Sequence, residues 1–195
     1  MTEEQFIFPL GTVLFPGAAL PLRIFEQRYI EMTKTCLRDG RPFGVCLIKE
    51  GREVGDPAVP QAVGCLATIE HWDMPQMGVF QLLARGADRF RLIDSQAAKN
   101  GLITGVVERL PADTPAELVD DACRRVLEMI IERVDASRFA KPYRLDDASW
   151  VGFRLAEILP LDMQTKQALL EMTEAAERLS RIRALLAEEG LIARS

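Results

Sequence analysis

Residues 8–30 read Phe8-Pro-Leu-Gly-Thr-Val-Leu-Phe-Pro-Gly-Ala-Ala-Leu-Pro-Leu-Arg-Ile-Phe-Glu-Gln-Arg-Tyr-Ile30, a run of large apolar residues interrupted by proline and glycine. Pro9, Pro16 and Pro21 each remove a backbone N–H, and a central strand does not tolerate that loss. Short strands separated by fixed turns do tolerate it. The stretch therefore indicates a chain that wraps the rim of a small barrel and then enters a helix.

Composition excludes some classes of protein. The chain has 195 residues, of which 48% are hydrophobic and 27% charged, and its 24 basic and 29 acidic residues give a net charge of −5. An acidic balance disfavours nucleic acid as a partner, because proteins that bind it carry basic patches. No apolar run approaches the roughly 20 residues of a membrane helix. The acidic start, Met1-Thr-Glu-Glu-Gln5, is unlike a signal peptide, so we expect a cytoplasmic protein without a membrane partner.

The cysteines do not indicate a metal site or disulfides. No pair has C-x-x-C spacing, and each cysteine lies in an apolar or periodic segment; the four are Cys36, Cys46, Cys65 and Cys123. We expect buried, reduced thiols. A zinc site would need more ligands than the single histidine, His71, could complete. We therefore expect neither a metal nor another cofactor.

Residues 1–112 predict strands and one helix. The helix is expected over 24–39, where Phe25, Tyr29, Met32 and Cys36 recur at helical spacing and Gly40 can end it. A turn is expected over 73–78 and a hairpin turn at Gly86-Ala-Asp88. The expected strands are 6–8, 13–15, 43–48, 63–70, 79–85, 89–94 and 102–110. Several short strands at this spacing suggest a barrel or a highly curved sheet.

Residues 113–195 predict a bundle of about four helices. Thr114-Pro-Ala-Glu117 is a helix start with a capping box, and an apolar stripe follows it to residue 134. Asp147 can cap a helix over 148–159, with Trp150 on its flank. A short helix is expected over 163–171, and a last one over 174–189 with Thr173 as its cap. The fold class is thus α+β, a β barrel followed by a helical bundle.

No residue stands out as catalytic. No serine lies in a G-x-S-x-G nucleophile elbow, and no lysine follows a glycine, so the phosphate-binding pattern G-x-x-x-x-G-K-S/T is absent. His71 is expected to be solvated or structurally hydrogen-bonded. Asp146 and Asp147 are expected to serve a helix start rather than a metal. The chain is therefore not expected to be an enzyme.

The opening stretch resembles the N-terminal, substrate-binding domain of Lon proteases. Phe43-Gly-Val-Cys-Leu-Ile48, Val63-Gly-Cys-Leu-Ala-Thr-Ile69 and Gly86-Ala-Asp-Arg-Phe-Arg-Leu92 resemble later motifs of that family in the same order. Leu159-Pro160 and residues 166–171 resemble its helical part. The resemblance implies a pseudo-barrel similar to PUA domains, an appended helical bundle and a polypeptide-binding role. It supplies no catalytic residues to carry over.

A full Lon protease continues into an ATPase module and a Ser–Lys peptidase module, and this sequence has neither. We therefore expect a non-catalytic module that binds unfolded or exposed polypeptide segments, which it could pass to a protease or chaperone. The expected contacts are apolar residues in loops fixed by proline and glycine: Leu14, Phe15, Trp72, Met74 and Met77. Methionines suit such a surface because they adapt to varied partners; the alternative, which the sequence slightly favours, is that Met74 and Met77 pack back over an end of the barrel.

Two alternatives stay open at this point. Arg85, Arg89 and Arg91 surround Phe90, and interleaved arginine and aromatic residues can bind single-stranded RNA; the acidic net charge favours a solvated charged strand face instead. PUA-like barrels alone give only a fold-level argument for RNA. A small-molecule site in the side of the barrel is the other alternative.

Overall fold

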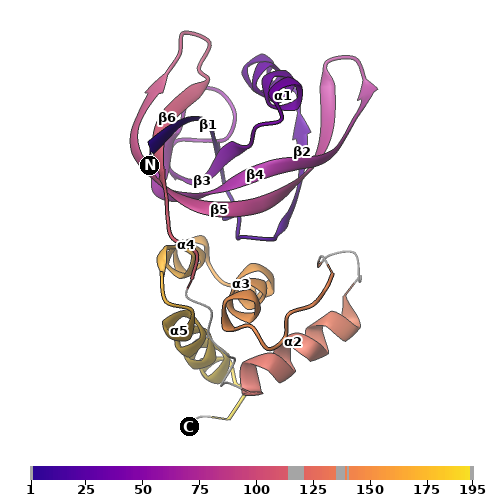
Figure 1. Cartoon of the computed structure of the whole chain (residues 1–195), viewed down its shortest axis with the longest axis vertical. Coiled ribbons are helices and arrows are strands. Elements are labelled where there is room, and N and C mark those ends of the chain that lie inside the picture. Colours follow the sequence, from indigo (N-terminus) through magenta and orange to yellow (C-terminus); the bar gives the residue numbers. More distant parts are fainter. Residues whose placement is uncertain (1, 114–120, 135–138, 140, 194–195) are drawn as a thin grey trace. The chain divides into compact units, whose positions relative to one another are not determined.

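The computed structural model describes residues 2–113, 121–134, 139 and 141–193 (Figure 1). The chain divides into two compact units, Met1–Leu110 and Pro111–Ser195. The described elements of the first unit are β1 (Thr2–Leu10), β2 (Ala19–Ile24), α1 (Gln27–Asp39), β3 (Phe43–Glu50), β4 (Val59–Gln76), β5 (Val79–Ala97) and β6 (Ile103–Arg109). Those of the second are α2 (Asp121–Arg133), α3 (Ala148–Ile158), α4 (Met163–Glu171) and α5 (Ala175–Glu188).

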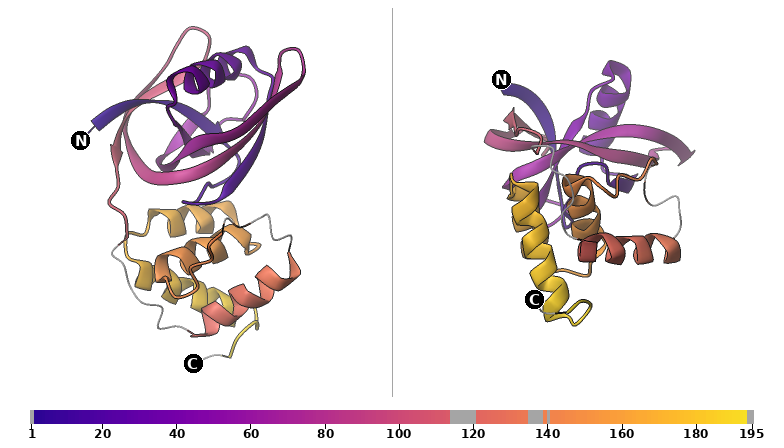
Figure 2. Two further views of the ribbon diagram at one scale, coloured as in Figure 1. Left: turned by 45° about the vertical axis from the view of Figure 1, so that its right-hand side comes forward. Right: turned by 60° about the horizontal axis from the view of Figure 1, so that its bottom comes forward.

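The strands of the first unit form a closed barrel with one strand added outside it. Their order among the described residues is β2-β5-β4-β3-β1-β6, and a further pairing of β5 with β6 closes the sheet into a ring of β5, β4, β3, β1 and β6. Strand β2 lies outside the ring, antiparallel to the first half of β5. Figure 2 shows this curved sheet from two further sides. The predicted α+β fold, with its barrel and its helical part, is confirmed.

The barrel interior is filled by side chains. Phe90 lies at its centre with no exposed surface, among Ile7, Cys46, Leu66, Ile103 and Val107. Gly44 and Gly64 make room for the ring, since a Cβ at these positions would lie 2.8 and 2.7 Å from Cζ of Phe90. This packing of the described core around Phe90 argues against a small-molecule site at the centre of the barrel.

The four cysteines are free and buried, as expected from the sequence. Burial raises the pKa of the Cys36 thiol to about 11 and that of Cys46 to about 12. A thiol with so high a pKa is inert at neutral pH, because the thiolate is the reactive form. All four cysteine side chains are buried in the interior of the protein.

One strand and one turn predicted for the first unit are not found in the structure. Residues 13–15, expected as a strand, lie in the loop between β1 and β2, where Val13, Leu14 and Phe15 are buried. The expected hairpin turn at Gly86–Asp88 is also absent from the described structure, because β5 runs through these residues without a break. The turn lies at Met77 and Gly78, inside the segment predicted as a turn, and β4 extends to reach it.

Gly86 allows two backbone segments to lie close together. The N–H of Gly86 donates to the carbonyl of Ala18 at 2.9 Å, and the N–H of Gly17 donates to the carbonyl of Gly86 at 2.7 Å. The proline-rich loop thus lies directly on β5, and a Cβ on residue 86 would collide with the carbonyl oxygen of Phe15. The glycine is required by this close approach of two backbones.

Phe25 was also placed wrongly by the helical pattern. Helix α1 begins at Gln27, so Phe25 precedes it, and the side chain is 52% exposed. Tyr29, Met32 and Cys36 are buried as predicted. Gly40 ends the helix in the left-handed conformation, with φ of 62°, and its N–H reaches the carbonyl of Cys36, which confirms its predicted position.

The helix starts of the second unit follow the predicted caps in part. Asp147 accepts hydrogen bonds from the N–H groups of Ser149 and Trp150 and so caps α3 as predicted, and Asp162 caps α4. Helix α5 begins after Glu174 instead of Thr173. Trp150 is buried and not on the flank. The predicted capping box at 114–117 lies outside the described residues.

A buried ion pair organises the second unit. Arg178 on α5 has no exposed surface, and its guanidinium binds both carboxylate oxygens of Asp113, whose side chain is also buried. The guanidinium also donates to the carbonyls of Leu169 and Met172 and lies over the ring of Phe153, 3.9 Å from its centroid. Bidentate geometry and further acceptors are what a buried guanidinium needs.

Gly86→Ala is expected to lower the free energy of unfolding by about 2–3 kcal/mol, because the added methyl group forces two hydrogen-bonded backbones apart. Thermal unfolding followed by circular dichroism measures this. The matched control is Gly152→Ala in α3, where the Cβ would lie an ordinary 3.4 Å from Arg178 and alanine favours the helix. Equal destabilisation of both variants would contradict the role given to Gly86.

Asp113→Asn and Arg178→Met are each expected to cost the second unit about 3–5 kcal/mol, because each leaves a buried partner uncompensated. The double variant Asp113→Asn/Arg178→Met should cost less than the sum of the two single changes. Urea unfolding, followed by the fluorescence of Trp150 in a Trp72→Phe background, measures these values. Additive costs would show that the pair is not coupled.

Candidate functional site

Three of the five predicted contact residues lie together at the end of the β4–β5 hairpin, which projects from the barrel (Figure 1). Trp72 is 55% exposed, Met74 38% and Met77 94%. We call this group the hairpin surface. Exposed large apolar side chains gathered on one projecting element are typical of an interaction site.

The other two predicted contacts are not available on the surface. Leu14 is 3% exposed and Phe15 not at all. The loop that carries them is fixed to β5 by the hydrogen bonds at Gly86, and their side chains are buried in the core. Neither side chain can therefore contact a polypeptide at the surface.

The sheet register connects the hairpin surface with β2. Trp72 on β4 lies opposite Leu82 on β5, and Leu82 lies opposite Leu22 on β2. Directly paired residues point to the same face of a sheet, so these three side chains form one row across three strands. The ring of Phe80, next to this row, has its centroid 5.8 Å from that of Trp72. Leu82 and Phe80 are themselves buried, so the register aligns Trp72 with Leu22 through residues of the core.

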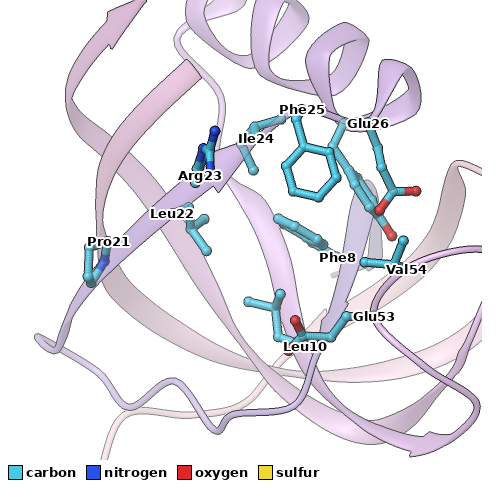
Figure 3. A pocket seen from close by; sticks show the side chains of 11 residues that line it. Phe8, Leu10, Pro21, Leu22, Arg23, Ile24, Phe25, Glu26, Glu53 and Val54 are labelled. Carbon is cyan, nitrogen blue, oxygen red and sulfur yellow. The ribbon is translucent and has the colours of Figure 1, made fainter. Parts of the chain in front are cut away.

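A groove lies beside β2 (Figure 3). Its volume is about 170 Å³, and we call it the β2 groove; its lining residues are Phe8, Leu10, Pro21, Leu22, Arg23, Ile24, Phe25, Glu26, Tyr29, Glu53 and Val54. The ring of Phe8 stacks on that of Tyr29 with centroids 4.0 Å apart. Phe25 and Val54, 52% and 59% exposed, add apolar surface.

The charges of the β2 groove have both signs. Arg23, Glu26 and Glu53 contribute to its lining. Glu26 is held by an ion pair with Arg28, at 2.9 Å, and Glu53 accepts a hydrogen bond from the N–H of Gly11. Since these two carboxylates already have partners within the domain, the groove is not arranged for one ligand of strong charge.

The sequence analysis missed the β2 groove. Phe25 was assigned to the buried face of a helix, and so was not considered for the surface. One signal could have found the groove: Pro21 lies in an apolar segment that forms a strand, and proline in a strand indicates the edge of a sheet. An edge strand beside an exposed aromatic residue is a candidate for binding.

The arginine cluster does not form the RNA-binding surface considered above. Arg85 donates to Glu70 at 2.6 Å and to the carbonyl of Gly17 at 3.0 Å, and this hydrogen bond holds the pKa of the Glu70 carboxyl below its usual value. Arg89 and Phe90 are buried. Arg91 is exposed on β5, but a base cannot stack on a ring in the barrel centre, so the predicted combination of arginines with Phe90 is not available at the surface.

The remaining candidate residues have ordinary environments. His71 is exposed on β4, and Asp146 pairs with Arg124 on α2 at 3.2 Å. Among the residues that the structure describes, no three His, Cys, Asp or Glu side chains are grouped so that they could hold a metal. No described helix is long and apolar enough to cross a membrane.

Known proteins resemble this chain across both of its units. The family model for the ATP-dependent protease La (LON) substrate-binding domain matches residues 5–188. Lon protease 2 of Herpetosiphon aurantiacus is 29% identical over 198 residues, which cover 96% of this chain and 24% of that protein. Lon protease of Paraburkholderia phytofirmans is 28% identical, with 92% and 24% covered. The chain thus spans about a quarter of the length of these curated relatives.

Solved structures agree with the sequence comparisons. The Lon N-terminal domain protein from Xanthomonas campestris superimposes with a TM-score of 0.79 at 38% identity, covering 93% of this chain and 98% of that one. The N-terminal domain of the Mycobacterium avium complex Lon protease has a TM-score of 0.64 at 17% identity, with 92% and 96% covered, which shows the shared fold. With the family match spanning most of its length, this chain belongs to the family of Lon substrate-binding domains.

Proposed function

We propose that this protein is a non-catalytic domain that binds exposed apolar segments of unfolded polypeptides. The observation that carries the proposal is the hairpin surface, where Trp72, Met74 and Met77 are all exposed on the β4–β5 hairpin. Family membership supports it, since the family is described as a substrate-binding domain.

The chemistry of the hairpin surface suits varied partners. Methionine side chains are flexible and polarisable, so they adapt to apolar groups of different shape. Trp72 adds a large, rigid apolar area, and aromatic residues are prominent among the contacts that dominate binding. A surface of this kind recognises apolar character rather than one sequence.

A protease or chaperone is the proposed recipient of the bound polypeptide. The curated relatives are Lon proteases, and this chain matches about a quarter of their length. A binding domain raises the local concentration of a polypeptide near any enzyme it is linked to or bound by. Delivery of polypeptides to such an enzyme is therefore the proposed purpose of binding.

Met77→Asp and Met74→Asp are expected to weaken the binding of unfolded casein by about 1–2 kcal/mol each, which is about fivefold to thirtyfold in Kd, because a charge replaces an apolar contact. Fluorescence anisotropy with labelled, reduced casein measures Kd. Met77 is almost fully exposed, so its replacement leaves folding intact.

The matched control is Met163→Asp, which introduces the same charge at an exposed methionine on α4. Its Kd should equal that of the unchanged protein. If the unchanged protein binds no unfolded polypeptide, or if all three variants weaken binding equally, the proposed function is wrong.

A further inference from the structure

We propose that an extended segment of the bound polypeptide adds as a strand to the free edge of β2 and places one apolar side chain in the β2 groove. This inference rests on the proposed function and specifies how the polypeptide is held. It assigns affinity to backbone hydrogen bonds as well as to apolar contacts, the mode known as β-augmentation.

The first observation is that β2 has an edge without a partner strand. Within the described part of the chain, β2 pairs with β5 alone. The hydrogen bond from the N–H of Gly86 to the carbonyl of Ala18 sets the alternation of this antiparallel pair. Backbone groups of Leu20, Leu22 and Ile24 then face β5, and those of Ala19, Pro21 and Arg23 face away. We call that outward side the free edge of β2.

The free edge of β2 offers acceptors and donors in a fixed pattern. Ala19 and Arg23 each present an N–H and a carbonyl, whereas Pro21 presents a carbonyl only. Proline is tolerated at this position because its missing N–H would have faced outward. Proline and charged residues can protect an edge from pairing. Here, however, one outward N–H and one outward carbonyl remain on each side of Pro21, at Ala19 and at Arg23.

The second observation is that the β2 groove runs along this edge. Four consecutive residues of β2, Pro21 to Ile24, line it. Successive side chains of a strand point to opposite faces. A groove lined by four consecutive residues therefore follows the edge of the strand rather than one of its faces. Figure 3 shows Phe8, Leu10 and Val54 across the groove from this edge.

The size of the groove fits a side chain better than a free small molecule. Its volume is about 170 Å³, below the roughly 300 Å³ at which pockets for drug-sized ligands begin. A strand added to β2 would lie about 4.8 Å from it, and its alternate side chains would continue the row formed by Trp72, Leu82 and Leu22. The occupant is therefore an extended segment with apolar residues at alternate positions.

This binding mode gives a physical reason for preferring unfolded polypeptides. In a folded protein, backbone N–H and carbonyl groups are already paired. An unfolded segment has these groups available over several consecutive residues. In this binding mode, the free edge of β2 binds backbone groups that have no partner in the polypeptide, and the hairpin surface binds its apolar side chains.

The experiment uses a fluorescein-labelled peptide of alternating leucine and threonine with lysines at both ends, and two N-methylated forms of it. In one form, the amides of every leucine are methylated, and in the other, those of every threonine. An added strand pairs with β2 through alternate residues only, so one form should bind at least about tenfold more weakly than the other. Equal affinities of the two forms would overturn the proposal.

A variant pair tests the same edge on the protein. Arg23→Pro removes an outward N–H and is expected to weaken the binding of the unmethylated peptide about fivefold to tenfold. Arg23→Ala keeps that N–H and is the control for loss of the side chain. Circular dichroism identifies any variant that does not fold, and the N-methylated peptides then decide the matter on the unchanged protein.

The outcomes separate this inference from the proposed function. If Met77→Asp weakens peptide binding but Arg23→Pro and N-methylation have no effect, the hairpin surface binds side chains and the edge of β2 is not used. If no peptide or casein binds, the proposed function fails as well. If light scattering finds a dimer that Arg23→Pro dissociates, a second copy occupies the edge and the inference is wrong.

Discussion

The first unit depends on the contact between two backbones at Gly86. There the proline-rich loop between β1 and β2 lies directly on β5, held by hydrogen bonds in both directions. This contact fixes where β2 begins and therefore its register on β5. Strand β5 can then pair with β2 and β4 in its first half and with β4 and β6 in its second. Both the barrel and the added strand follow from it.

The same contact determines which apolar residues reach the surface. Because the loop is held on β5, Leu14 and Phe15 are buried in the core. Strand β2 stays outside the closed ring, which leaves its outward edge and the β2 groove accessible. An apolar face beside an unpaired strand edge is a liability in most proteins, because it invites association. Under the proposed function, this face and this edge would serve to bind unfolded polypeptides.

The second unit is held together in part by a buried ion pair. Asp113 and Arg178 are 65 positions apart in the sequence, yet they form a buried bidentate pair. The guanidinium has further acceptors on Leu169 and Met172. Burying charge is costly unless every donor finds such partners. The pair thus ties the start of this unit to its last described helix.

Local signals in the sequence were reliable where the physics is local. The Gly40 helix end and the Asp147 cap were predicted correctly, because capping involves groups only a few residues apart. Burial of the four cysteines followed from their apolar surroundings. The motif order from Phe8 to Leu92 indicated the family and, through it, the barrel with its helical part.

The errors arose where a residue's surroundings come from distant segments. Gly86 resembled a turn residue, but the reason for it is the loop some 70 residues earlier. Arg85, Arg89 and Phe90 resembled an RNA-binding pattern, until the closed barrel placed the ring at its centre. Phe25 was assigned to a buried helix face because periodicity does not locate the first residue of a helix.

By itself, then, the sequence determined the family, the α+β class and a turn next to Trp72 that carries Met74 and Met77. Only the tertiary structure decided that Leu14 and Phe15 are buried and that β2 presents a free edge beside a groove. The reason is physical: propensities and caps depend on neighbours along the chain, whereas burial and strand edges depend on which distant segments pair.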